Sequence, residues 1–409
     1  MFRPFGQEEA MINAVRPGAH LLANYARLPL TIVRGVGCEL IDDEGIRYLD
    51  FVAGIAVCAL GHAHPEITAA IAGQAATLVQ CSNLFSHEPA GTLADTLAER
   101  SNFDRVFFCN SGAEATEAAI KLARKHAFRR GEPSRTTILA ARGSFHGRTF
   151  GALAATDNAA YREGFEPLPG GFEFTPFNDI DALRTAITDR TAAFIVEPVQ
   201  GESGVKPATR EFLEAARQIC DERGALLIFD EVQCGMGRLG TLFAFQTYGV
   251  VPDAFTLAKA LANGLPIGAL IIRGECASAL RPGDHGTTFG GSPIPCAAAL
   301  KHLVLRDRLD LDAHVLHVGA VLLDELRAIA DEHPDYFEEP RGLGLMLGLP
   351  VRSPHEAKTF VNAGFDFNVI LNAAGANTLR FVPPLIITDG EVRAGMERFR
   401  QTIDRVKTT

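Results

Sequence analysis

The sequence predicts an α/β fold in which a mostly parallel sheet is flanked by helices, with a smaller α+β domain beside it. Strand candidates follow one another at residues 105–109, 136–141, 192–197, 225–229, 254–258 and 268–272, and helical patterns at 113–130 and 210–223 lie between some of them. At least two candidates, Phe107-Phe108 and Leu226 to Phe229, are continuous apolar runs. Such runs are typical of parallel strands that are buried on both faces.

The two ends of the chain predict shorter elements. A hairpin-like section has strand candidates at 30–34, 39–41 and 46–51, and helical patterns follow at 65–80 and 89–100. Beyond residue 295, helices are expected at 296–308, 314–333, 354–363 and 389–406, with strands at 344–349 and 378–381. We expect residues 1–55 and 311–409 to join into one small domain beside a large cofactor-binding domain of residues 56–310.

Composition indicates an ordinary globular protein of 409 residues, with 47% hydrophobic and 22% charged residues. The formal charge of −10 argues against general nucleic-acid affinity. No stretch has the roughly 20 uninterrupted apolar residues of a membrane span, and the N-terminus lacks a secretion-signal pattern. The eight cysteines are scattered singly without a C-x-x-C pair, which favours a cytoplasmic location. No metal-ligand spacing is present, and His62 and His64 are expected to make loop contacts.

Lys259 stands in an unusually apolar sequence, DAFTLAKALANGLPIG, directly after the 254–258 strand. Burying an unpaired ammonium is unfavourable, so a lysine in such surroundings tends to lose its proton. A neutral lysine is a nucleophile that can form a Schiff base with a carbonyl compound or with pyridoxal phosphate. The alternative is a lysine whose amine reaches the surface from a strand end.

Two further strand ends supply groups that a Schiff-base lysine needs. Asn110-Ser111-Gly112-Ala113 lies at a strand-to-helix turn, where backbone N–H groups at a helix N-terminus predict a phosphate seat or an ordinary N-cap. Asp230 follows the buried 225–229 strand, at the sheet edge where open α/β folds bind ligands. A carboxylate there keeps a pyridine nitrogen protonated.

A competing motif overlaps Asp230. Gly235-Met236-Gly237-Arg238-Leu239-Gly240 matches G-x-G-x-x-G after a strand, so a nicotinamide-dinucleotide-binding dehydrogenase is a remote alternative. Two acidic residues at the turn and a poor helix after it argue against a bound pyrophosphate.

Elsewhere, Phe145 could stack on a planar cofactor, and Arg148 and Arg380 could clamp carboxylates or be solvated. Glu202, in a glycine-flanked loop, could pair with such an arginine.

Taken in chain order, these segments resemble the class III aminotransferases of pyridoxal-phosphate fold type I, and most of all the acetylornithine and succinylornithine branch. The motifs that carry the resemblance are GIAVCALGHAHPE (54–66), NSGAEA (110–115), FHGRT (145–149), EPVQGESG (197–204), FDEVQCGMGRLG (229–240), LAKALANGLPIGA (257–269), HGTTFGG (285–291), RGLGLMLG (341–348) and LRFVPPL (379–385). They span nearly the whole chain, and their joint specificity is high.

The resemblance implies a role for each candidate. Lys259 would be the Schiff-base lysine, and Asp230 would pair with the pyridine nitrogen. Cofactor contacts are implied for Ser111, Gly112, Ala113, Phe145, Val232 and Gln233, with Thr288 reaching the phosphate from the other subunit of a homodimer. Substrate contacts are implied for Tyr25, Arg148, Glu202, Thr287 and Arg380. Three positions depart from the family: Ala113 replaces a threonine, and Cys58 and Ser292 replace asparagines.

The resemblance also implies a reaction. Pyridoxal 5'-phosphate would serve transfer of the terminal amino group of N-acetylornithine, or a close N-acyl analogue, to 2-oxoglutarate in arginine metabolism. Succinylornithine, succinyl-diaminopimelate, ornithine and 4-aminobutyrate are alternative donors. Other rivals are a decarboxylase, racemase or aminomutase of the same fold type, or a non-catalytic binding protein that keeps the fold.

Overall fold

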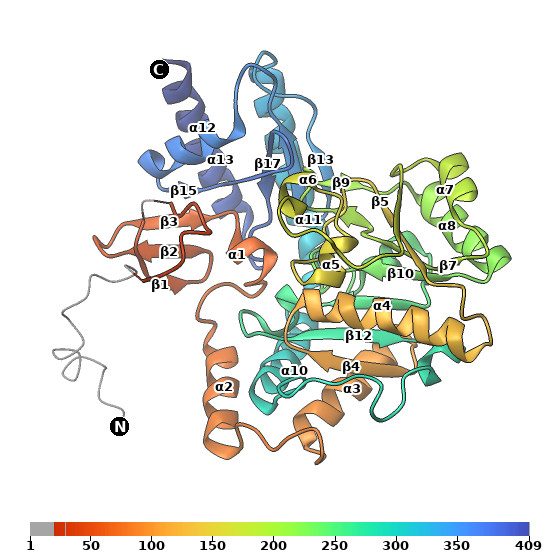
Figure 1. Cartoon of the computed structure of the whole chain (residues 1–409). Coiled ribbons are helices and arrows are strands. Elements are labelled where there is room, and N and C mark those ends of the chain that lie inside the picture. The colour runs from red at the N-terminus through yellow and green to blue at the C-terminus, as the bar shows by residue number, and fades with distance from the viewer. Residues whose placement is uncertain (1–19, 29, 409) are drawn as a thin grey trace.

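The computed structural model describes residues 20–28 and 30–408. Residues 1–19 of the predicted N-terminal segment lie outside the described residues. Within these residues the central sheet runs in the order β4-β12-β11-β10-β7-β5-β6 (Figure 1). Its strands are β4 (Arg105–Cys109), β5 (Thr137–Ala141), β6 (Phe172–Thr175), β7 (Thr191–Val196), β10 (Leu226–Asp230), β11 (Ala254–Leu257) and β12 (Gly268–Ile272). Only β12 is antiparallel to its neighbours, so the predicted mostly parallel α/β sheet is confirmed.

Successive residues of a strand point to opposite faces of the sheet. In this sheet the side chains of both faces are buried. Along β10, Leu227 and Phe229 belong to one hydrophobic cluster and Ile228 belongs to another. Helix α4 (Gly112–Arg129) covers the Ile228 side, and α8 (Arg210–Arg223) packs on the Leu227 side. Both helices are capped by a hydroxyl at the N-terminus, Ser111 in α4 and Thr209 in α8.

The other helices flank the sheet or belong to the chain ends. They are α2 (Pro65–Thr77), α3 (Glu88–Ser101), α5 (Phe150–Ala154), α6 (Ala159–Arg162), α7 (Ile180–Ala186), α9 (Ala244–Tyr248), α10 (Pro293–Arg308), α11 (Leu311–Glu332), α12 (Ala357–Gly364) and α13 (Asp389–Lys407). Short 3-10 helices are η2 (Lys259–Ala262), η3 (Gly274–Ser278) and η4 (Phe365–Phe367). No helix within the described ranges is long and apolar enough to cross a membrane.

Three smaller sheets complete the fold. The first combines β1 (Ile32–Val36), β2 (Glu39–Asp42) and β3 (Arg47–Asp50) with β15 (Val369–Ile370). The second combines β13 (Arg341–Leu343), β14 (Met346–Pro350), β16 (Asn372–Ala374) and β17 (Thr378–Phe381). The third pairs β8 (Val199–Gln200) with β9 (Lys206–Pro207). Because β15 pairs in parallel with β3, the N-terminal strands lie beside the C-terminal helices α12 and α13 (Figure 1). The domain boundaries at residues 55 and 310 stay a prediction.

One turn of left-handed helix, α1 (Ala53–Ala56), follows β3 and was not expected from the sequence. Its φ angles are all positive, from 50° to 67°, and the bond from Val57 N–H to the Ala53 carbonyl measures 2.8 Å. This conformation costs roughly 1–2 kcal/mol per non-glycine residue. Buried Asp50 holds the turn, because its Oδ1 accepts the N–H groups of Val52 and Ala53 at 2.8 and 2.9 Å. His62 binds the other Asp50 oxygen at 2.8 Å, which places this histidine in a loop contact as predicted.

Candidate functional site

A cavity of about 420 Å³ opens at the carboxyl ends of the central strands. Its lining includes residues 110–113 after β4, residues 145–148 after β5, Glu197 after β7, Asp230, Val232 and Gln233 at the end of β10, and Ala258 and Lys259 after β11. Parallel strands bring their carboxyl ends to one edge of a sheet, so groups far apart in the sequence meet there. The volume falls in the range of small-molecule sites.

Lys259 enters this cavity directly after β11, where it starts η2 with a positive φ of 33°. Its amine makes no hydrogen bond or ion pair within residues 20–28 and 30–408. Burial lowers the pKa of the Lys259 ammonium, although Glu202 and Asp230 act in the opposite direction. Asn263 ends the turn, and its Oδ1 accepts the Leu60 N–H at 2.7 Å. Burial thus weakens the hold of Lys259 on its proton, and the Asn263 contact fixes the end of the turn that carries it.

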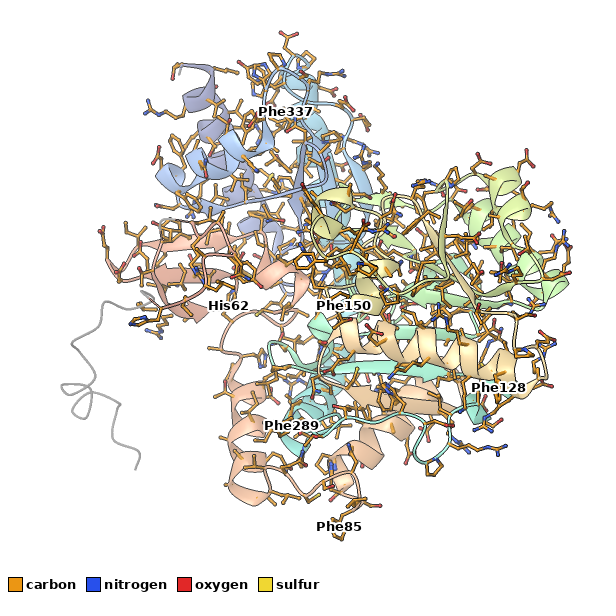
Figure 2. All side chains as sticks on the ribbon, viewed as in Figure 1. His62, Phe85, Phe128, Phe150, Phe289 and Phe337 are labelled. Carbon is orange, nitrogen blue, oxygen red and sulfur yellow. The ribbon has the colours of Figure 1, made fainter. Side chains whose placement is uncertain are left out.

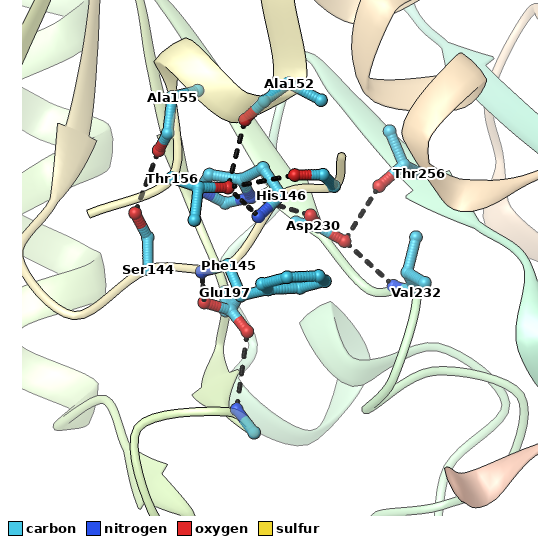
Figure 3. A network of polar contacts seen from close by, with 12 residues as sticks. Ser144, Phe145, His146, Ala152, Ala155, Thr156, Glu197, Asp230, Val232 and Thr256 are labelled. Atoms are coloured by element: carbon cyan, nitrogen blue, oxygen red, sulfur yellow. Dashed lines mark hydrogen bonds and ion pairs between the residues drawn. The ribbon is translucent and has the colours of Figure 1, made fainter. Parts of the chain in front are cut away.

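Asp230 is held by partners on both carboxylate oxygens (Figure 3). Its Oδ1 accepts the Val232 N–H and the Thr256 hydroxyl, both at 3.1 Å, and its Oδ2 contacts His146 Nδ1 at 2.7 Å. Burial alone lowers the pKa of His146, but the hydrogen bond and charge of Asp230, with the charge of Glu197, outweigh burial and raise it. The Asp230 carboxylate is therefore fixed in position, with the His146 ring behind it.

Glu197 is a second buried carboxyl group of the cavity. Its oxygens accept the backbone N–H groups of Phe145 at 3.0 Å and Gly201 at 3.3 Å. Burial, together with the nearby charge of Asp230, raises the pKa of Glu197 to about 7. Its hydrogen bond to the Phe145 backbone fixes the base of an aromatic side chain that lines the cavity.

The N-terminus of α4 forms one wall of the cavity. Ser111 caps the helix by accepting the Glu114 N–H at 3.2 Å, and Glu114 in turn accepts the Asn110 N–H at 2.6 Å. At Gly112, an added Cβ would lie 2.8 Å from Cγ1 of Val232, so no larger residue fits there. The N–H groups of Gly112 and Ala113 make no hydrogen bond within the described part of the chain. This wall therefore offers backbone donors to an anion.

Arg380 and Glu202 form an ion pair beside Gln233, one of the residues that line the cavity. Arg380, 1% exposed, donates from Nη1 to Glu202 Oε1 at 2.5 Å and to Gln233 Oε1 at 3.2 Å. Asn372 Oδ1 accepts two further hydrogen bonds, from Arg380 Nε at 3.0 Å and Nη2 at 2.6 Å. Burial raises the pKa of Glu202, but the charge and hydrogen bond of Arg380 outweigh it and lower the pKa overall.

Arg148 lies between this cavity and a second one of about 430 Å³. The second cavity is lined by Asn24, Tyr25, Arg148, Phe150, Leu153, Tyr161 and Phe165. The structure therefore places Tyr25 beside Arg148 but not among the residues that line the Lys259 cavity. Thr287 and Thr288 also lie outside the lining of the Lys259 cavity of their own chain. Thr287 Oγ1 accepts a hydrogen bond from Asn110 Nδ2 at 2.9 Å, and Thr288 is exposed.

Sequence reasoning missed several residues of the site. His146 and Glu197 stand inside the quoted motifs FHGRT and EPVQGESG, yet nothing in those letters shows that both side chains turn inward.

The glycine-rich segment 235–240 does not open a ligand-binding helix. Its Arg238 is buried and donates to the carbonyls of Leu345 and Pro383. Within residues 20–28 and 30–408 no cluster of three potential metal ligands occurs.

Comparisons with known proteins place the chain in a well-populated group. The family described as Aminotransferase class-III matches residues 22–403. The acetylornithine aminotransferase of Methanocaldococcus jannaschii is 46% identical over 385 residues, 94% of this chain and 96% of that protein. The ornithine aminotransferase structure from Toxoplasma gondii aligns with a TM-score of 0.92 at 34% identity, covering 95% and 93% of the two chains. For N-acetylornithine aminotransferase from Stenotrophomonas maltophilia the TM-score is 0.83 at 38% identity, covering 94% and 98%.

Proposed function

This chain belongs to the class III aminotransferases, and we propose that it transfers the terminal amino group of N-acetylornithine to 2-oxoglutarate in arginine metabolism. The family, the fold and the aminotransferase activity predicted from the sequence are confirmed by the comparisons. The donor is a proposal, and it rests on the names of relatives at 43–46% identity and on the arrangement of the two arginines.

Class III aminotransferases use pyridoxal 5'-phosphate, which supplies an electron sink for the carbon that loses or gains the amino group. The cavity residues fit this group. The free N–H groups of Gly112 and Ala113, beside Ser111, would hold a phosphate, and Phe145 and Val232, which both line the cavity, would contact a planar ring. We propose Asp230 as the partner of the ring nitrogen, because its carboxylate is held from behind by His146. Gln233 keeps one amide N–H for the ring hydroxyl. Thr288 of the partner subunit is proposed to reach the phosphate.

Lys259 is proposed to hold the cofactor and to carry the proton. Burial lowers the pKa of its ammonium, which favours loss of the proton, so we propose Nζ as the group that accepts a proton from the substrate carbon and returns it. Because no described residue forms a hydrogen bond with this amine, the amine is free to move between the cofactor and the substrate carbon. Glu202 and Asp230 lie close enough to stabilise the protonated form transiently.

The arrangement of the two arginines is the observation that carries the choice of substrates. Arg148 has no carboxylate partner within the described ranges, so it can bind the α-carboxylate of a donor, with Thr287 as a further proposed contact. Arg380 is neutralised by Glu202, so a donor with no second carboxylate meets no unpaired charge there. When 2-oxoglutarate binds, its second carboxylate would replace Glu202 on Arg380. N-acetylornithine has one carboxylate and 2-oxoglutarate has two, which suits this arrangement, and the choice of the acyl donor among donors with one carboxylate rests on the names of the relatives.

A panel of donors tests the proposed substrate. We expect kcat/KM with 2-oxoglutarate to be highest for N-acetylornithine and at least about tenfold lower for ornithine and 4-aminobutyrate, because neither carries the acyl group. N-succinylornithine and N-succinyl-diaminopimelate complete the panel as acyl analogues. A higher kcat/KM for ornithine or 4-aminobutyrate would overturn the donor assignment. Repeated turnover without 2-oxoglutarate, beyond one equivalent of product per site, would instead indicate a decarboxylase, racemase or aminomutase.

Replacing Glu202 by Gln tests the charge arrangement at Arg380. The variant leaves Arg380 unneutralised, so we expect the N-acetylornithine half-reaction to slow about tenfold while the glutamate half-reaction keeps or gains rate. Single-turnover rates of the two half-reactions measure the ratio directly. The matched control is Glu173→Gln, an exposed carboxylate on β6. Equal slowing of both half-reactions by Glu202→Gln would contradict a role in discriminating substrates.

We propose a homodimer as the working form. Several apolar side chains are exposed together around the segment that carries Thr287 and Thr288. Phe85 and Phe289 are 69% and 62% exposed and lie on the same lower side of the molecule (Figure 2). Asn83 Nδ2 joins the two segments by donating to the carbonyls of Thr287 at 3.0 Å and Gly290 at 3.1 Å.

We also propose a cytoplasmic location, which the eight free cysteines favour.

A further inference from the structure

Arg148 is held by aromatic rings and by no polar partner among residues 20–28 and 30–408. Its guanidinium carbon lies 3.6 Å from the ring centroid of Tyr161 and 5.7 Å from that of Phe145. The two rings meet edge to face with centroids 6.0 Å apart. A guanidinium at 3.6 Å is in stacking contact, so Tyr161 is the nearer support.

Tyr161 comes from a segment that the cofactor and substrate motifs do not include. It lies on the short helix α6, which Asn158 caps by accepting the Ala160 N–H at 3.1 Å. Tyr161 is half-buried, it lines the second cavity together with Arg148, and its hydroxyl makes no hydrogen bond within the described residues. The ring face, rather than the hydroxyl, therefore makes the contact with Arg148.

A stacked guanidinium keeps all its N–H donors in the plane of the group, where a carboxylate can bind in a bidentate manner. The ring also fixes the orientation of that plane, which reduces the entropy lost when the carboxylate binds. A salt bridge would fix Arg148 too, but it would occupy the donors that the ligand needs. An aromatic support leaves the charge available.

We propose that Tyr161 is a positioning residue that holds the Arg148 guanidinium ready for the α-carboxylate of N-acetylornithine and for one carboxylate of 2-oxoglutarate. This inference rests on the proposed role of Arg148 in binding that carboxylate. It adds a specificity residue outside the catalytic motifs, one that sets carboxylate affinity without touching the substrate. Because the support is the ring face, phenylalanine is expected to replace tyrosine, whereas leucine, which is apolar but has no ring, is not.

Four variants test this proposal: Tyr161→Phe, Tyr161→Leu, Arg148→Ala and the double variant Tyr161→Leu/Arg148→Ala. We expect Tyr161→Leu to raise KM for N-acetylornithine and for 2-oxoglutarate about tenfold with kcat within about twofold, and Tyr161→Phe to behave as the unmodified protein. The dissociation constant of 2-oxoglutarate, measured by calorimetry, should rise in parallel. The double variant should be no weaker than Arg148→Ala alone, because Tyr161 acts through that arginine.

Different outcomes distinguish a failure of the proposed carboxylate role of Arg148 from a failure of the proposed positioning role of Tyr161. If Arg148→Ala leaves KM and the dissociation constant unchanged, the proposed carboxylate role of Arg148 is wrong. If Arg148→Ala weakens binding but Tyr161→Leu does not, the Arg148 role stands and the Tyr161 inference is overturned. Additive losses in the double variant, with a lower kcat and melting temperature, would show a general packing defect at α6 and also overturn it.

Discussion

Replacing Lys259 by Ala is expected to reduce kcat by at least about 10⁴-fold, because the variant loses the amine that we propose both as the nucleophile that holds the cofactor and as the base that moves the proton. Lys259→Arg should not restore activity, since a guanidinium stays protonated at every relevant pH. The amine lies in a cavity where burial lowers its pKa, so its loss removes the group on which the site is centred. Steady-state assays with N-acetylornithine and 2-oxoglutarate measure the effect.

Lys206 provides a matched control for this variant. It is an exposed lysine on β9 that lies outside the Lys259 cavity, so Lys206→Ala should keep full turnover and the same melting temperature. A Lys259→Ala protein that folds with an unchanged melting temperature and still turns over within tenfold of the unmodified enzyme would show that the chemistry does not depend on this lysine.

The second large effect is expected at Asp230. Asp230→Asn keeps an acceptor for the Val232 N–H and the Thr256 hydroxyl, but it removes the negative charge that faces His146. Because that charge is what keeps a pyridine nitrogen protonated, we expect kcat/KM to fall about 10²- to 10⁴-fold with only a small change in stability. Single-turnover rates and the melting temperature together separate the two effects.

Glu231 is the control for Asp230, since it is a neighbouring buried carboxyl group that faces the protein interior. It accepts the N–H groups of Ala244 and Phe245, and burial raises its pKa to about 8. Glu231→Gln is therefore expected to lower the free energy of unfolding by about 1 kcal/mol and to keep turnover. Equal losses of turnover in Asp230→Asn and Glu231→Gln would indicate a packing effect and contradict a specific role for the Asp230 charge.

Much of the central sheet could be predicted, because strands buried on both faces leave continuous apolar runs such as 226–229. β6 was missed, since its sequence FEFT alternates and is too short to stand out. The left-handed turn α1 could not be predicted either, because Ala53 and Ala56 have no intrinsic preference for positive φ and adopt it only under the hydrogen bonds of Asp50.

The site was predictable where a strand end places a reactive group, as for Asp230 and Lys259. It was not predictable where a side chain matters through a neighbour. His146 acts on Asp230, Asn372 holds Arg380 and Tyr161 supports Arg148, and each of these contacts joins segments that the chain order separates. A single sequence carries no signal for such pairs, since each residue alone suits an ordinary core or loop position.

The central claim is that Lys259 holds the cofactor in the cavity at the sheet edge, and the site of covalent attachment tests it most directly. The protein is loaded with pyridoxal 5'-phosphate, reduced with borohydride, digested and mapped by mass spectrometry. We expect a phosphopyridoxyl group on the peptide that contains Lys259, and none on that peptide in Lys259→Ala. Attachment at another lysine, or no attachment in a protein that still transfers amino groups, would contradict it.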